Sequence, residues 1–209
     1  MYKLYGRPGS GSGAVEAVLR LAEIDCEIVD LSRWAEGEPP AELLAVNPLG
    51  QVPTLILPDG GIMTESAAIC VHLADLHPSC GLSPSISEPS RAAFLRWMFY
   101  LAANIYMSEL RCYYPYRYTL DPGAADGIRQ SALERRTFEW SVFADALGDR
   151  SFALGDKLSA VDIYAAMLIS WVDDLDVFCE RFPALRALYA RVAEVPAIAK
   201  VWARHGMPV

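Results

Sequence analysis

The chain has 209 residues, of which 53% are hydrophobic and 21% charged, so it can bury one large core or two of ordinary size. Its 18 Lys and Arg against 26 Asp and Glu give a formal net charge of −8. Such an acidic surface disfavours nonspecific binding to nucleic acid or to an anionic membrane, because both need clustered Lys and Arg. We therefore expect no nucleic-acid partner and no membrane partner.

The five cysteines are odd in number and widely spaced, and no two of them form a CxxC pair. They indicate neither a disulfide framework nor a zinc site, and the three scattered histidines lack the spacing of metal ligands. The N-terminal sequence MYKLYG lacks the basic and apolar regions of a secretory signal, and no apolar run approaches the ~18 residues that span a bilayer. We expect a reduced, cytoplasmic protein without a metal or a resident cofactor.

The first 77 residues predict a small mixed sheet with helices. A Gly/Ser loop over 6–13 precedes a helix whose apolar residues Val15, Val18 and Leu19 share one face. In chain order the predicted elements are a strand over 2–5, this helix, a strand over 26–31, a short helix over 41–45, strands over 52–57 and 62–63, and a helix from 64–66 to His77. This order is typical of a thioredoxin-like α/β domain.

Composition changes after His77. Residues 78–89 are rich in Pro, Ser and Gly and indicate a linker, and no strand alternation follows them. The predicted helices cover 91–114, 124–147, 159–174, 184–195 and 197–204. The chain is therefore predicted to be a thioredoxin-like domain over 1–79 and an all-helical domain over 88–209, joined by a linker at about 80–87.

The segment Asn47-Pro48-Leu49-Gly50-Gln51-Val52-Pro53-Thr54-Leu55 contains a proline at the start of a predicted strand. Because proline lacks the N–H of a sheet ladder, it marks either an ordinary trans strand start or a special bond. If the Val52–Pro53 bond is cis, the turn exposes the backbone of Val52 for pairing with an extended peptide.

Glu65 and Ser66 stand at the start of a predicted helix. Unpaired N–H groups and the positive end of the helix dipole allow Ser66 to hold a carboxylate, and Glu65 can accept hydrogen bonds from an ammonium group. Together they suit the head of a zwitterionic amino acid. Taken alone, the pair more often indicates simple helix capping, with Thr64 or Ser66 as the N-cap.

The stretch NPLGQVPTL, a two-strand hairpin and TES at a helix start together resemble the glutathione S-transferase family over essentially the whole chain. The resemblance implies that Val52 pairs with the cysteinyl backbone of glutathione before a cis Pro53, with Gln51 in the same binding loop. It also implies that Glu65 and Ser66 bind the γ-glutamyl ammonium and carboxylate. A homodimer with glutathione as co-substrate is the expected assembly.

A second family feature lies in the helical region. Ser159 and Asp162 precede an apolar helix at the spacing of a capping box, in which each side chain satisfies a backbone N–H near the other residue. We expect this pair to stabilise the fold and to take no part in catalysis.

The group that activates the glutathione thiol is expected in the loop Arg7-Pro8-Gly9-Ser10-Gly11-Ser12-Gly13. The loop resembles that of bacterial classes with a Pro-Gly-x-Cys-Ser sequence, but Gly11 stands where their cysteine is found. This departure removes mixed-disulfide chemistry and leaves hydroxyl donors, of which Ser10 is the first candidate, Ser12 the second and Tyr5 the third. Backbone N–H groups of the glycine-rich loop are the alternative donors.

A second substrate is expected between the domains. Aromatic and basic side chains suited to line its pocket are Tyr106, Arg111, Tyr113 and Trp171. For any single aromatic residue, a place in the core of the helical bundle is the competing interpretation.

The predicted function is attack of the glutathione thiolate on a small electrophile in the interdomain cleft. Two alternatives remain open on the same scaffold. One is glutathione-dependent reduction or isomerisation, and the other is a noncatalytic binding protein, since fold alone does not decide between them.

Overall fold

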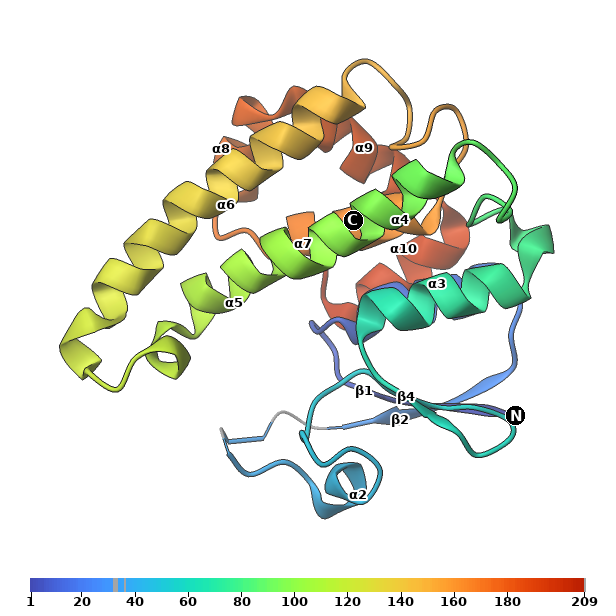
Figure 1. Ribbon diagram of the computed structural model, residues 1–209, viewed down its shortest axis with the longest axis horizontal. Helices are drawn as coiled ribbons and strands as arrows, with labels where there is room; N and C mark the ends of the chain where they lie inside the picture. Colours follow the sequence, from blue (N-terminus) through green and yellow to red (C-terminus); the bar gives the residue numbers. More distant parts are fainter. Residues whose placement is uncertain (32–33, 36, 209) are drawn as a thin grey trace.

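The computed structural model describes residues 1–31, 34–35 and 37–208, and it shows a small sheet domain followed by a helical domain (Figure 1). The predicted fold class, a thioredoxin-like domain followed by an all-helical domain, is confirmed. Residue 209, the last of the predicted helical domain, lies outside the described residues.

The sheet contains four strands in the order β2-β1-β3-β4: β2 (Cys26–Asp30), β1 (Tyr2–Gly6), β3 (Thr54–Ile56) and β4 (Ile62–Met63). Strand β2 is parallel to β1, whereas β3 and β4 run antiparallel to their neighbours. Strand β3 is shorter than the predicted 52–57. It begins after Pro53 because proline has no N–H to give to the ladder.

The two faces of the sheet have different partners. Helices α1 (Ser12–Leu21) and α3 (Ser66–Leu76) contact each other on the face that meets the helical domain, and the short α2 (Ala41–Leu44) lies on the opposite face (Figure 1). Since side chains alternate along a strand, Leu4 joins the main core with α1, and Tyr5 joins a separate small cluster with Leu31 and Leu43.

The long helix predicted over 91–114 is present over 91–113 and contains a π-helical stretch. The structure has α4 (Arg91–Tyr100), a π-helical segment (Leu101–Ile105) and α5 (Tyr106–Tyr113). The sequence of this stretch contains no Pro or Gly, so the helix continues through it, and nothing in the sequence predicted the π-helical stretch. A π segment changes the angular register of the residues after it, and such segments occur frequently at functional sites.

The remaining helices are α6 (Ala125–Leu147), α7 (Ala160–Ile169), α8 (Leu175–Arg181), α9 (Pro183–Ala193) and α10 (Pro196–His205), with short 3₁₀ turns at Pro78–Cys80, Pro115–Tyr118 and Pro122–Ala124. The helix predicted over 159–174 ends early, at Ile169, and α8 was not predicted. Asp174 caps α8 by accepting a hydrogen bond of 3.1 Å from the N–H of Val177.

Helix α7 is the centre of the molecule, because every one of its residues is buried. The predicted capping box is present: the Asp162 carboxylate accepts from the N–H of Ser159 at 2.8 Å and from its hydroxyl at 2.7 Å. Asp162 also accepts from the N–H of Ala153 at 2.7 Å, and it is fully buried. One carboxylate therefore fixes both the start of α7 and the loop before it.

We predict that Asp162→Ala lowers the free energy of unfolding by about 3 kcal/mol or more, because it leaves two buried backbone N–H groups unpaired. Ser159→Ala removes a single capping side chain and should cost about 1 kcal/mol. Chemical denaturation measures both values. Asp145, an exposed acid of α6, supplies the matched control Asp145→Ala, whose effect should stay within ~0.5 kcal/mol. Equal losses for Asp162→Ala and Asp145→Ala would contradict the structural role.

Candidate functional site

Four helices converge on one point between the two domains. Gly11 precedes α1, and Ser66 and Tyr106 are the first residues of α3 and α5. A Cβ atom added to Gly11 would lie 3.0 Å from the Tyr106 hydroxyl oxygen and 3.3 Å from the Ser66 hydroxyl oxygen. Ser66 in turn shares a hydrogen bond of 2.8 Å with the hydroxyl of Tyr164 in α7. The starts of α1 and α3 thus open on the same place, which favours a negatively charged ligand group.

The start of α3 presents unpaired backbone N–H groups that can donate hydrogen bonds to a ligand. Its first helical hydrogen bond runs from the N–H of Ile69 to the carbonyl of Glu65, so the N–H groups of residues 66–68 have no helical partner. Glu65 has φ 66° and ψ 100°, a conformation that costs a side-chain-bearing residue free energy. This strain turns the chain sharply between β4 and α3 and leaves the Glu65 side chain exposed beside the helix start.

The loop serines hydrogen-bond to each other. Ser10 donates to the carbonyl of Arg7 at 2.6 Å, and the two hydroxyl oxygens of Ser10 and Ser12 are 2.8 Å apart. Because the Ser10 proton is committed to Arg7, Ser12 must be the donor in the second bond. Ser10 also accepts from the N–H of Ser12, and Ser12 accepts from the N–H of Arg7, each at 3.3 Å. Both hydroxyl protons are used within the loop.

Tyr5, the third candidate donor, lies in the small cluster on the α2 side of the sheet. It is 9% exposed and packs with Leu31, Leu43 and Val52. The alternation of β1 therefore separates Tyr5 from the face on which α1 and α3 lie.

The loop before β3 contains backbone N–H and C=O groups that are available for hydrogen bonding. The Val52–Pro53 peptide bond is cis, and among the described residues neither the N–H nor the C=O of Val52 has a hydrogen-bond partner. Asn47 holds this loop in place: its side-chain amide donates to the Gln51 carbonyl and to the Thr54 hydroxyl at 3.0 Å each. The Asn47 side-chain oxygen accepts from the N–H of Leu49 at 3.1 Å.

Asn47 was not singled out by sequence reasoning, which assigned it only to a turn. The signal that it is more than a turn residue is its burial, at 4% exposed, which the sequence does not reveal.

Three of the four residues predicted for a second-substrate pocket lie together. The rings of Tyr106 and Trp171 meet edge to face with centroids 5.1 Å apart, and the Tyr113 hydroxyl donates to the carbonyl of Trp171. Burial raises the pKa of Tyr106 to about 12, although the nearby Arg7 acts in the opposite direction.

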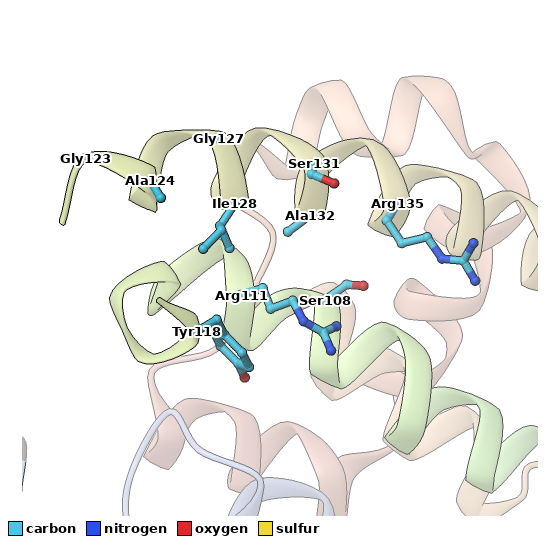
Figure 2. Close-up of a pocket in the computed structure, with 10 residues that line it drawn as sticks. All are labelled: Ser108, Arg111, Tyr118, Gly123, Ala124, Gly127, Ile128, Ser131, Ala132 and Arg135. Carbon is cyan, nitrogen blue, oxygen red and sulfur yellow. The ribbon is translucent and has the colours of Figure 1, made fainter. Parts of the chain in front are cut away.

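Arg111, the fourth, lies elsewhere. It lines a cavity of about 680 Å³ between α5 and α6, together with Ser108, Tyr118 and Arg135 (Figure 2). Its guanidinium stands over the Tyr118 ring, 5.2 Å from the centroid. The helical register separates it from Tyr106, because five positions along a helix correspond to a rotation of about 140°.

The described part of the chain contains neither a cluster of metal-binding side chains nor a membrane-spanning helix. Residues 1–31, 34–35 and 37–208 contain no group of three or more His, Cys, Asp or Glu that could hold a metal ion. Within the same ranges, none of the helices combines the length and apolar character that crossing a membrane requires.

Comparisons with known proteins agree with this geometry. Residues 12–76 match the family described as glutathione S-transferase, N-terminal domain, and residues 110–196 match glutathione S-transferase, C-terminal domain. The chain is 32% identical over 206 residues to the uncharacterized GST-like protein YncG of Escherichia coli (strain K12), with 98% of both chains covered. It is 27% identical to the glutathione S-transferase GstA of Escherichia coli O157:H7, over 98% of this chain and 99% of that protein.

Solved structures give the same result. A ternary complex of BphK, a bacterial GST, has a TM-score of 0.84 and 27% identity over 98% of this chain and all of that one. A sphingomonad glutathione S-transferase complexed with glutathione has a TM-score of 0.83 and 27% identity over 99% of this chain and all of that one. With both of its domains matched and a relative above 30% identity along nearly its full length, the chain belongs to the glutathione S-transferase family.

Proposed function

We propose that the chain binds glutathione and activates its thiol for attack on a small electrophile between the two domains. The observation that carries this proposal is the unpaired backbone of Val52, an edge suited to an extended peptide, in a domain whose helix α3 begins with free N–H groups. The similarity to a glutathione S-transferase solved with glutathione supports the choice of peptide.

In the proposed binding mode, the start of α3 holds the γ-glutamyl group of glutathione and the loop before β3 holds its cysteinyl group. Ser66 and the free N–H groups after it hold the γ-glutamyl carboxylate, because a helix start favours an anion. The exposed Glu65 carboxylate accepts from the γ-glutamyl ammonium. Val52 pairs with the cysteinyl backbone before Pro53, and Gln51 lies next to it in the same loop.

The proposed chemistry is nucleophilic substitution or addition by sulfur. The thiol of glutathione loses its proton to water, its sulfur forms a bond to an electrophilic carbon, and the displaced electron pair leaves with the departing group or is protonated by water. A free thiol has a pKa of about 8.5, so donors beside the sulfur must stabilise the thiolate at neutral pH. Ser10 and Ser12 are the candidate side-chain donors of the N-terminal domain and would have to turn from their bonds within the loop, whereas Tyr5 lies on the other face of the sheet. Backbone N–H groups of the loop are the alternative donors. Tyr106, Tyr113 and Trp171 form the proposed wall for the electrophile.

We infer a homodimer in a cytoplasmic setting, where conjugation of electrophiles would serve detoxification; the family supports this assembly and location. Reduction through a mixed disulfide is disfavoured at this loop, because Gly11 offers no thiol. Isomerisation and noncatalytic binding would use the same glutathione site, and single-turnover reaction with a panel of electrophiles distinguishes them from transfer.

Glu65→Gln and Ser66→Ala should each weaken glutathione binding by ~1–3 kcal/mol, the cost of one lost charge-assisted hydrogen bond. Isothermal titration calorimetry measures the affinities. Glu180, an exposed acid of α8, supplies the control Glu180→Gln, which changes the net charge equally and should leave affinity unchanged. Wild-type affinity in both site variants would refute the proposed γ-glutamyl site.

Asn47→Ala should lower the free energy of unfolding by about 2–3 kcal/mol, since three hydrogen bonds of the loop are lost. It should also weaken glutathione binding, because the backbone of Val52 is no longer held in position. Denaturation and calorimetry on the same preparation measure the two effects. A destabilised variant that keeps full affinity would show that the loop does not need this support to bind the peptide.

A further inference from the structure

A cluster of charged side chains joins the last helix, α10, to the first, α1. Glu16 of α1 is only 2% exposed, and Arg204 of α10 donates to its carboxylate from Nε at 2.9 Å and also from Nη2. The same guanidinium donates to both carboxylate oxygens of Asp30, at 2.7 and 2.6 Å. One arginine near the C-terminus therefore binds α1 and the end of β2 at once through charge-assisted hydrogen bonds.

His205 completes the cluster. Its side chain is fully buried, its Nε2 lies 3.0 Å from Glu16 Oε2, and its Nδ1 has no hydrogen-bond partner among the described residues. Burial and the neighbouring Arg204 lower the pKa of His205 to about 4, so the ring is neutral near pH 7. Because a carboxylate only accepts, the ring proton that faces Glu16 is on Nε2. Two residues of α10 thus hold one buried carboxylate of α1.

Two glycines allow the end of α10 to approach the loop before α1. A Cβ atom added to Gly13, in the first turn of α1, would lie 2.8 Å from Met207 Cε and 3.3 Å from His205 Nδ1. Gly9 has φ 69°, and a Cβ atom added there would lie 3.9 Å from the carbonyl oxygen of His205. Since glycine is a poor helix former, Gly13 is explained by this close approach and not by helix propensity.

The C-terminal segment that contacts these glycines is held in place by its own hydrogen bonds. The N–H of Met207 donates to the carbonyl of Trp202 at 2.9 Å, and the hydroxyl of Tyr189 in α9 donates to the carbonyl of Pro208 at 2.5 Å. The end of α10 is therefore a fixed support for the start of α1.

The supported loop also borders the proposed glutathione site. Gly11, between Gly9 and Gly13 in the sequence, has other neighbours: a Cβ atom added to it would lie 3.0 Å from the Tyr106 hydroxyl oxygen and 3.3 Å from the Ser66 hydroxyl oxygen. The loop is thus in contact with α10 and with the site at the same time. Because hydrogen bonds weaken steeply with distance and angle, a shift of the loop changes what its N–H and hydroxyl groups can donate to a ligand.

We propose that Arg204 and His205 are positioning residues of the glutathione site: through Glu16 they hold the start of α1 so that the loop over 9–13 presents its donors to the thiol. The inference rests on the proposed function, because it requires the thiol of glutathione to lie beside this loop. It gives the C-terminal helix a role in the reaction that is exerted through α1 and not by contact with the ligand.

The test is an ultraviolet titration of the thiolate in the complex with glutathione, over pH, in the wild type and in Arg204→Gln. We expect the variant to raise the pKa of bound glutathione by about half to one unit, which is a three- to ten-fold loss of thiolate at a pH below both values. S-methylglutathione, which has no ionisable thiol, should bind with unchanged affinity, because α3 and the loop before β3 hold its other groups. A lower denaturation midpoint with an unchanged thiol pKa would show a purely structural role and overturn the proposal.

Arg20→Gln is the matched control. Arg20 lies 4.0 Å from Glu16 Oε1, and its side chain is 53% exposed. The substitution removes the same charge beside the same carboxylate, but Arg20 belongs to α1 itself and cannot hold α1 against α10. Its titration curve should coincide with that of the wild type. Equal shifts in Arg20→Gln and Arg204→Gln would overturn the proposal, since they would arise from charge alone.

His205→Gln and His205→Met form a second, independent pair. Glutamine keeps an N–H donor for Glu16, whereas methionine has a similar length and no donor. We expect His205→Met to raise the pKa of bound glutathione and His205→Gln to retain most of the wild-type value. Arg204 still compensates Glu16 in both variants, so the pair gives a result even where Arg204→Gln does not fold. Coincident titration curves of the two variants would overturn the proposal.

Failure of this inference is distinguishable from failure of the proposed function. If the wild type binds no glutathione by calorimetry, the proposed function fails and the inference fails with it. If the wild type binds glutathione and the α10 variants leave the thiol pKa unchanged, only the role of Arg204 and His205 fails.

Discussion

The hydrogen bond between Ser66 and Tyr164 joins the two domains at the place where the site lies. Ser66 begins α3 of the sheet domain, and Tyr164 belongs to the fully buried α7 of the helical domain. The main core is continuous across this boundary, since residues of β1, α1 and α3 pack with those of α7 and α10. The start of α3 is thus positioned by the helical domain as much as by its own sheet, and a ligand held there reaches both domains at once.

The position of α5 depends on buried polar groups. Arg136 of α6 donates to Glu109 at 2.8 Å, and Ser108 donates to Glu139 of α6 at 2.7 Å. Glu109 is fully buried, and burial raises its pKa to about 7 while Arg136 opposes the rise. Removing one partner of such a pair leaves a buried charge uncompensated, so α5 and α6 are held in one register. These contacts therefore also fix the position of Tyr106, the first residue of α5.

Short sequence patterns predicted the features that neighbouring residues alone determine, namely turns, helix starts and helix caps. The sequence around Val52-Pro53 and Glu65-Ser66 was enough to predict the turn before β3 and the start of α3, and Ser159 with Asp162 was enough to predict the capping box. The same patterns did not predict the π segment before Tyr106, because its residues are ordinary helix formers without Pro or Gly. They also did not predict the bonding of Ser10 to Ser12, because a loop of this composition can turn either hydroxyl inward or outward.

What could not be predicted is the meeting of Gly11 with Tyr106, two residues that are far apart in the sequence and in different domains. Sequence reasoning treated Gly11 as the loss of a reactive side chain and looked for a replacement within the same loop. The structure shows that a neighbouring hydroxyl of the helical domain lies against the vacated position. In a chain with a net charge of −8, the overall field does not attract an anion, so a bound anion must be held by groups in direct contact with it. Around Gly11 lie the hydroxyls of Ser66 in the sheet domain and of Tyr106 and Tyr164 in the helical domain, so this place is formed by both domains and not by the loop alone.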